Sequence, residues 1–206
     1  MAPADAPYNM SFTAGALLYR ESMVVAGLAG EALDWDRVKH EVLAGNLLQM
    51  RTPSASQRIL REVTARLRLL TPTQVRLLLG GSRPEQNLLL WLAVCKRYRF
   101  IREFAVDVVQ EKYLRLDLAV SYEDYDVFFN AKAEWHSEVE SLAPSTRSKL
   151  RQIVFRMLRE AEILTSSNRI VPVLMTPQLA AAVAEDDPAY FAIFPMAAPQ
   201  LTRPTS

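Results

Sequence analysis

The side chains whose types and spacing most clearly predict a chemistry lie between residues 145 and 159, where polar and basic residues recur at the period of an α-helix. At about 100° per residue, one helical face carries Ser145, Ser148, Lys149, Gln152, Arg156 and Arg159. No carboxylate interrupts this face before Glu160. Such side chains donate hydrogen bonds to phosphates and base edges, which is typical of a DNA-binding helix. An ordinary amphipathic surface helix also has a charged outer face, so that interpretation stays open.

The neighbouring segments predict how this face is positioned. Pro144 prevents a continuous helix through the preceding turn, and Ser145 is a suitable N-cap for the basic helix. An apolar stripe at helical spacing predicts the buried face, formed by Leu150, Ile153, Val154, Met157, Leu158 and Ala161. Short strands at residues 163–164 and 170–173 flank a polar turn at 166–169 and predict a hairpin. A helix, a turn, a basic helix and a hairpin follow each other in this order in a winged helix-turn-helix.

The helical geometry assigns a role to each polar side chain. Five are expected to enter or flank the DNA major groove: Arg147, Ser148, Lys149, Arg151 and Gln152. Arg156 and Arg159 are expected to bind phosphates, and Arg169 is expected to hold the hairpin against the DNA backbone. Contacts of this kind predict binding that weakens steeply with salt.

Residues 38–70 are compatible with a second helix-turn-helix. Its first helix would end near Gly45, and the segment TPSASQRILREVTARLR would form the second. Arg58, Arg61 and Arg68 share one side of that second helix, and Arg58 and Arg61 are its expected DNA-binding residues. An ordinary loop between bundle helices explains the Thr-Pro pair at 52–53 equally well.

Few residues could support catalysis or bind a metal. The two histidines, His40 and His136, have no partnering motif, and phosphate-loop, dinucleotide, nucleophile-elbow and zincin signatures are absent from the sequence. An acidic trio could hold a divalent cation but also fits the first turn of a helix: Glu123, Asp124 and Asp126. Cys95 lies in an apolar run and is expected to be a buried thiol. The sequence therefore predicts no enzyme, no cofactor, no metal and no small-molecule substrate.

Charge is segregated along the chain. The net charge of +1 gives no general attraction to nucleic acid, so local patches must supply it. Residues 50–115 hold thirteen basic and five acidic residues (+8), 145–170 hold six and two (+4), and 117–140 hold one and seven (−6). Arginine outnumbers lysine nineteen to five, which suits bidentate contacts with phosphate and guanine but also follows from a GC-rich genome.

The densest mixture of basic and aromatic residues is KRYRFIREF at 96–104. Tyr98 or Phe100 could stack on the bases of a single strand. The apolar residues of this region also follow helical spacing, and the favoured interpretation is that they belong to the core while the arginines pair with nearby acids.

Capping signals predict where helices begin. A helix is expected from Thr13 to about residue 28, and another begins after Asp34 or Asp36. Ser54 or Ser56 is expected to cap a third, and residues 85–116 are expected to be one long helical region. Further starts follow the caps Thr71, Ser121 and Thr176.

These elements predict an all-α fold, in which a helical bundle (10–118) precedes a winged helix-turn-helix region (119–196) with a short β-hairpin. The tails 1–9 and 197–206 are expected to be flexible. The N-terminus lacks the pattern of a signal peptide, and no apolar run reaches the roughly 18 residues that span a bilayer. A soluble, cytoplasmic protein is therefore expected, with no membrane partner.

Four blocks of sequence carry a resemblance to a known family: SFTAGALLYRES (11–22), LLLWLAVCKRYRFIREFAVDVVQEKYLRLDL (88–118), YEDYDVFFNAKAEWHSEVESLAPSTRSKLRQIVFRMLREAEIL (122–164) and DDPAYFAIFP (186–195). The chain resembles the BrxA family of bacteriophage exclusion (BREX) defence systems over about residues 10–195. This resemblance implies a mostly helical, NusB-like protein that binds double-stranded DNA beside other BREX proteins, including a methyltransferase and an ATPase. It supplies no catalytic motif. One departure is Glu162, because a small residue is expected after the basic helix and glutamate suits a left-handed C-cap poorly.

Two other functions compete with DNA binding. A winged module can serve as a protein-docking adaptor, which would be favoured if Arg156 and Arg159 paired with Glu138, Glu140 or Glu162. RNA binding is a third hypothesis, suggested by the comparison with NusB.

Overall fold

The computed structural model describes residues 6–14, 16–30 and 34–196. Their helices are α1 (Tyr19–Ala29), α2 (Trp35–Ala44), α3 (Pro53–Leu67), α4 (Pro72–Gly80), α5 (Arg83–Arg97), α6 (Arg99–Phe104), the π-helix η1 (Ala105–Gln110), α7 (Glu111–Leu114), α8 (Tyr122–Ala133), α9 (Ser137–Glu140), α10 (Pro144–Glu160), α11 (Pro177–Asp186) and the 3₁₀ helix η2 (Pro188–Ile193). These residues form no β-strand; isolated bridges join Ala119 to Arg169 and Leu164 to Ile170. The described chain is mostly helical, which agrees with the predicted all-α class.

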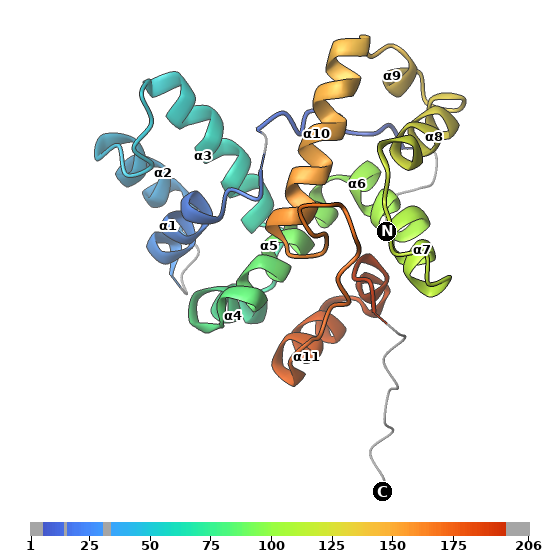
Figure 1. The fold of residues 1–206 in the computed structure, drawn as a ribbon. Helices are drawn as coiled ribbons and strands as arrows, with labels where there is room; N and C mark the ends of the chain where they lie inside the picture. Colours follow the sequence, from blue (N-terminus) through green and yellow to red (C-terminus); the bar gives the residue numbers. More distant parts are fainter. Residues whose placement is uncertain (1–5, 15, 31–33, 197–206) are drawn as a thin grey trace, which may run out of the picture.

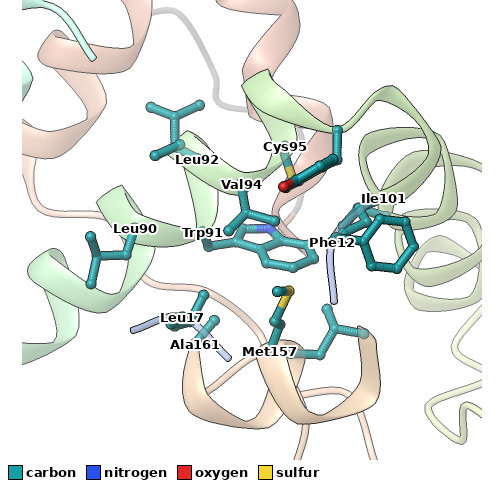
Figure 2. Close-up of a cluster of buried hydrophobic side chains, with 14 of the residues drawn as sticks. Phe12, Leu17, Leu90, Trp91, Leu92, Val94, Cys95, Ile101, Met157 and Ala161 are labelled. Carbon is teal, nitrogen blue, oxygen red and sulfur yellow. The ribbon is translucent and has the colours of Figure 1, made fainter. Parts of the chain in front are cut away.

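Helix α5 forms the centre of the fold because its middle is apolar on every side. Residues 88–95 are all buried, and α5 contacts α1, α3, α4, α6, α10 and η2. Figure 2 shows Trp91 of α5 among side chains of α10 and of the N-terminal segment, including Met157 and Phe12. The Trp91 Nε1–H also donates to the carbonyl of Ile193 at 3.1 Å, which fastens the C-terminal segment to the core.

Figure 1 shows α2 and α3 at one end of the molecule and α8 and α9 at the other, with α5 and α10 between them. One cluster of buried apolar side chains contains residues on both sides of position 118, where the sequence analysis divided the chain. The two regions therefore share a hydrophobic core. None of the helices in the described ranges is long and apolar enough to cross a bilayer.

The N-terminal arm, residues 6–14 and 16–18, differs from its prediction. The sequence predicts a helix from Thr13 and a flexible tail through residue 9, whereas α1 begins at Tyr19. Tyr8 is buried, its N–H donates to Glu138 Oε1 at 2.7 Å, and its hydroxyl donates to Glu103. Phe12 is fully buried. Burial of these apolar side chains holds the arm in place without a helix; residues 1–5 and 197–206 lie outside the described residues.

Prolines explain two corrected helix starts. Thr52 rather than Ser54 or Ser56 caps α3, since its hydroxyl accepts from the Ala55 N–H at 3.2 Å and Pro53 takes the first helical position. Ala143 rather than Ser145 is the N-cap of α10, because Pro144 takes the first position there. Proline suits that position since its missing N–H would be unpaired anyway. The predicted caps Thr71, Ser121 and Thr176 are confirmed.

The long helical region expected at 85–116 is interrupted at Tyr98. This residue has extended backbone angles, φ −119° and ψ 95°, between α5 and α6. Its hydroxyl donates to Glu62 Oε1 of α3 at 2.6 Å, and its side chain is fully buried. The break turns the tyrosine toward α3, a long-range contact for which the local sequence has no signal.

Candidate nucleic-acid interface

Helix α10 has the two faces that its sequence predicts. Its apolar stripe is buried against the core, through Leu150, Ile153, Val154, Met157, Leu158 and Ala161. On the opposite side four polar residues are exposed at spacings i, i+4, i+7 and i+11: Ser145, Lys149, Gln152 and Arg156. We call these four residues the α10 face. They extend over about 16 Å, at 1.5 Å per residue.

Lys149 and Gln152 are the residues of the α10 face most available for binding. Both are exposed, and neither side chain has an ion pair or hydrogen bond within the described ranges. An ammonium and an amide can donate to a phosphate or a base edge without first leaving a protein partner.

Arg147 and Arg151 point toward α8 and share one carboxylate. Arg147 Nη2 lies 3.2 Å from Asp126 Oδ1, and Arg151 Nη1 pairs with Asp126 Oδ2. Each guanidinium also covers an aromatic ring, that of Phe129 at 4.4 Å and that of Tyr122 at 4.8 Å from the ring centroid. These half-buried arginines join α10 to α8. Ser148, also expected at DNA, is only partly exposed.

The two arginines near the end of α10 differ in their partners. Arg156 Nε lies 2.7 Å from Glu160 Oε1, and the arginine side chain is 61% exposed. An exposed i,i+4 pair of this kind contributes only about 0.3–0.5 kcal/mol, so it does not prevent contact with a phosphate. Arg159 donates from Nη1 to Asn168 Oδ1 at 2.8 Å, which ties the helix to the following turn. Neither arginine pairs with Glu138, Glu140 or Glu162 in the described chain.

The segment expected to form the hairpin is compact but contains no strand. The Thr165 N–H donates to the Arg169 carbonyl at 2.9 Å, and the Val171 N–H donates to Ile163 at 2.9 Å. Asn168 has φ 59°, a left-handed conformation that asparagine tolerates better than most residues. Arg169 at this turn is exposed, and its guanidinium has no protein partner within the described residues.

Glu162 ends α10 in the left-handed conformation that the sequence analysis identified as poorly suited to glutamate. Its φ is 61°, and the Ile163 N–H donates to the Leu158 carbonyl at 2.9 Å across the turn. The glutamate accepts a hydrogen bond from Asn87 Nδ2 at 3.0 Å. The strained backbone of Glu162 is therefore accompanied by a side-chain hydrogen bond to Asn87 of α5.

The second predicted DNA surface lies on α3. Arg58 and Arg61 are exposed there, at the end of the molecule opposite α8 (Figure 1). Eight residues, 45–52, connect α2 to α3, and two of them, Asn46 and Gln49, have positive φ. Arg61 also lines a groove of about 770 Å³ between the two helices. Sequence reasoning missed this groove, although its lining residues recur at helical spacing on both helices.

The other candidate residues have structural roles. Tyr98 and Phe100 are fully buried, so they cannot stack on a nucleic-acid strand, and the core interpretation of 96–104 is confirmed. Asp124 accepts from the Ser121 N–H in a capping box, and no group of three potential metal ligands occurs in the described ranges. Cys95 is fully buried, and burial raises the pKa of its thiol well above the usual value.

Comparison with known proteins identifies similar sequences over most of the chain. The family model described as BrxA matches residues 6–187. A BREX protein BrxA of Bacillus cereus (strain H3081.97) is 27% identical over 157 residues, covering 76% of this chain and 78% of the relative. One from Escherichia coli O9:H4 (strain HS) is 24% identical, covering 75% and 73%. One from Paramagnetospirillum magneticum (strain ATCC 700264 / AMB-1) is 23% identical, covering 91% and 95%.

The fold also resembles a solved structure. The crystal structure of an uncharacterized protein from Magnetospirillum magneticum superimposes with a TM-score of 0.78 at 22% identity, covering 92% of this chain and 98% of that chain. At this level of identity the likeness concerns the fold alone.

Proposed function

The chain belongs to the BrxA family, and from that premise we propose that it is a non-catalytic, double-stranded DNA-binding component of a bacterial BREX phage-defence system. The observation that carries DNA binding is the α10 face, a polar and basic stripe on a helix whose other side is buried in the core. A rigid helix with such a stripe fits the DNA major groove, which is wide enough to admit an α-helix. Action on DNA implies the cytoplasm, beside other BREX proteins.

We infer that residues 119–196 work as a winged helix-turn-helix. Its support is the order in which segments meet: an extended segment at 118–120 precedes α8, and the turn after α10 returns to it. The Val120 N–H donates to Asn168 at 3.0 Å, and the Ile170 N–H donates to Leu118 at 2.7 Å. This arrangement would present Arg169 and the α10 face on neighbouring parts of the surface. A NusB-like bundle for the remaining helices is part of the same proposal.

The contacts of each side chain refine its proposed role. Lys149 and Gln152 would read or flank base edges, because both are exposed without protein partners in the described ranges. Arg156 and Arg169 would bind phosphates. Arg147, Arg151 and Arg159 would contribute mainly by fixing α10 to α8 and to the turn, since each already has a protein partner.

Fluorescence anisotropy of a labelled duplex against a salt series tests this proposal. We expect a Kd in the micromolar range or tighter near about 100 mM salt, weakening steeply as salt rises. Lys149→Ala/Arg156→Ala should weaken duplex binding, and loss of the Arg156 phosphate contact should reduce the slope of log K against log salt by about 0.9. The matched control is Arg76→Ala/Arg115→Ala, which removes two exposed arginines outside α10 and should bind as wild type does.

Other results would point to the rival functions. Duplex binding lost only in Arg58→Ala/Arg61→Ala would move the interface to α3. Tighter binding to duplex RNA of equal length would favour an RNA-binding protein. No binding to any nucleic acid would overturn the proposal and favour a protein-docking adaptor.

A further inference from the structure

A groove between α2 and α3 has the features of a protein-docking site. It encloses about 770 Å³. The two helices that line it lie next to each other at one end of the molecule (Figure 1). Along α3 and its C-cap residue, the lining runs from Gln57 to Arg68, a length of about 16 Å at 1.5 Å per residue. This length equals about three turns of a second helix laid along it.

The floor of the groove is apolar. Trp35 and Leu43 line it from α2, and Leu60 lines it from α3. Leu69, just beyond α3, lines the same groove and is 41% exposed. Covering an exposed leucine in a concave, apolar surface with another apolar side chain is favourable. The stabilisation is roughly 25 cal/mol per Å² of apolar surface removed from water.

The rim of the groove is positively charged. Four cations line it, Lys39, Arg61, Arg68 and Arg97, against the single acid Asp36. Lys39 and Arg61, on opposite walls, are exposed and have no ion pair within the described residues. The occupant should therefore be apolar on one face and acidic along both edges of that face.

We propose that this groove binds an acidic amphipathic helix of about three turns from a partner protein. Helix-in-groove recognition uses apolar side chains at i, i+3/i+4 and i+7, and the cations on both walls would pair with flanking glutamates or aspartates. Duplex DNA fits poorly, because it has no apolar side chains to cover the leucines. A single nucleic-acid strand would stack on aromatic rings, whereas Trp35 is the one ring in this lining and Arg68 lies over it at 5.7 Å.

The three tryptophans allow the site to be located directly. Trp35 lines the groove, Trp91 is buried beside α10, and Trp135 is 82% exposed near α9. The probe is a synthetic helical peptide of about 15 residues with leucines on one face and glutamates on both flanks; its control has lysine at every glutamate position. In ¹⁵N-labelled full-length protein, the acidic peptide should shift the Trp35 indole N–H resonance in a saturable manner. The Trp91 and Trp135 resonances should stay in place.

Matched variants separate groove binding from general attraction of charge. Lys39→Ala/Arg61→Ala should weaken the acidic peptide at least about tenfold, with unchanged Trp91 and Trp135 signals as evidence that the fold is intact. Arg51→Ala/Arg58→Ala removes two exposed arginines that do not line the groove and should bind as wild type does.

Three results would overturn the proposal: no saturable Trp35 shift, equal binding of the lysine peptide, or equal weakening in both variants. A saturable Trp35 shift with single-stranded oligo(dT) but not with the acidic peptide would assign the groove to nucleic acid instead. The duplex experiment on the α10 face is independent, so either proposal can fail alone.

Discussion

At the scale of single residues, the arginines of α10 divide into those that hold the fold and those that face solvent. Of the six residues that sequence periodicity placed on the outer side of the helix, four are exposed, whereas Ser148 and Arg159 are only partly exposed. Periodicity could not predict that Asp126, eighteen residues before Pro144, lies against Arg147 and Arg151. That pairing depends on how α8 packs, which is a tertiary property. The role of each candidate residue therefore depends on partners that its own segment does not contain.

Asp126→Asn tests this division. The change leaves the half-buried guanidiniums of Arg147 and Arg151 without their shared carboxylate, so we expect the free energy of unfolding to fall by about 1–2 kcal/mol. The same change removes one negative charge beside the α10 face, so duplex binding at low salt should become tighter. Urea unfolding measures the first effect and anisotropy the second. Glu134→Gln, an exposed acid of the same region, is the control and should leave the free energy of unfolding within about 0.5 kcal/mol.

Tyr98 gives a prediction about alkaline stability. Burial, and then the hydrogen bond to Glu62, raise the pKa of its hydroxyl from 10.0 to about 12. A raised folded-state pKa means that the stabilisation is complete below pH 10, where the unfolded tyrosine is also neutral, and is lost as the pH rises from 10 to 12.

The Tyr98→Phe variant isolates this contribution. Wild type should lose about 2 kcal/mol more than the variant between pH 9 and pH 12 in denaturant unfolding, because two pKa units correspond to about 2.7 kcal/mol at full ionisation. At pH 8 the variant should be about 1 kcal/mol less stable, since it lacks the bond to Glu62. Parallel stability curves for the two proteins would contradict the assignment.

At the scale of elements, local signals predicted the helices whose ends are determined by adjacent residues. Thr71, Ser121 and Thr176 are caps in both sequence and structure, because a hydroxyl beside a helix start acts over only three residues. The N-terminal arm and the break at Tyr98 were not predicted, since each depends on contacts with distant helices. The hairpin strands predicted at 163–164 and 170–173 are not confirmed, since the described chain has only an isolated bridge between Leu164 and Ile170 there.

The end of α10 provides a test at this scale. Because Glu162 has φ 61°, glycine should relieve the left-handed strain while alanine should keep it. Both substitutions lose the hydrogen bond from Asn87. The difference between their free energies of unfolding therefore isolates the cost of the left-handed backbone at this position. We expect Glu162→Gly to be about 1 kcal/mol more stable than Glu162→Ala in urea unfolding. Equal stabilities would mean that the turn relaxes out of the left-handed region.

At the scale of the whole molecule, the shared core determines how the chain should unfold. The sequence analysis divided the chain at residue 118, just after the long helical region expected at 85–116. In the structure α5 packs on α3 from one side of that division and on α10 from the other. Composition and periodicity identified which residues are buried, but they could not indicate that the two sets of buried residues meet around Trp91 (Figure 2).

A core variant in α10 should therefore destabilise helices on both sides of residue 118. Met157 is fully buried beside Trp91, so Met157→Ala should cost about 2–5 kcal/mol. If the chain opens as one unit, hydrogen exchange followed by mass spectrometry should show the most protected amides of α3 and α5 losing as much protection as those of α10. Val127→Ala, at a side chain that is 70% exposed, is the control and should leave the protection of all three helices unchanged. Unchanged protection in α3 would mean that the bundle and the α10 region unfold separately, each with its own stability, despite the core that they share.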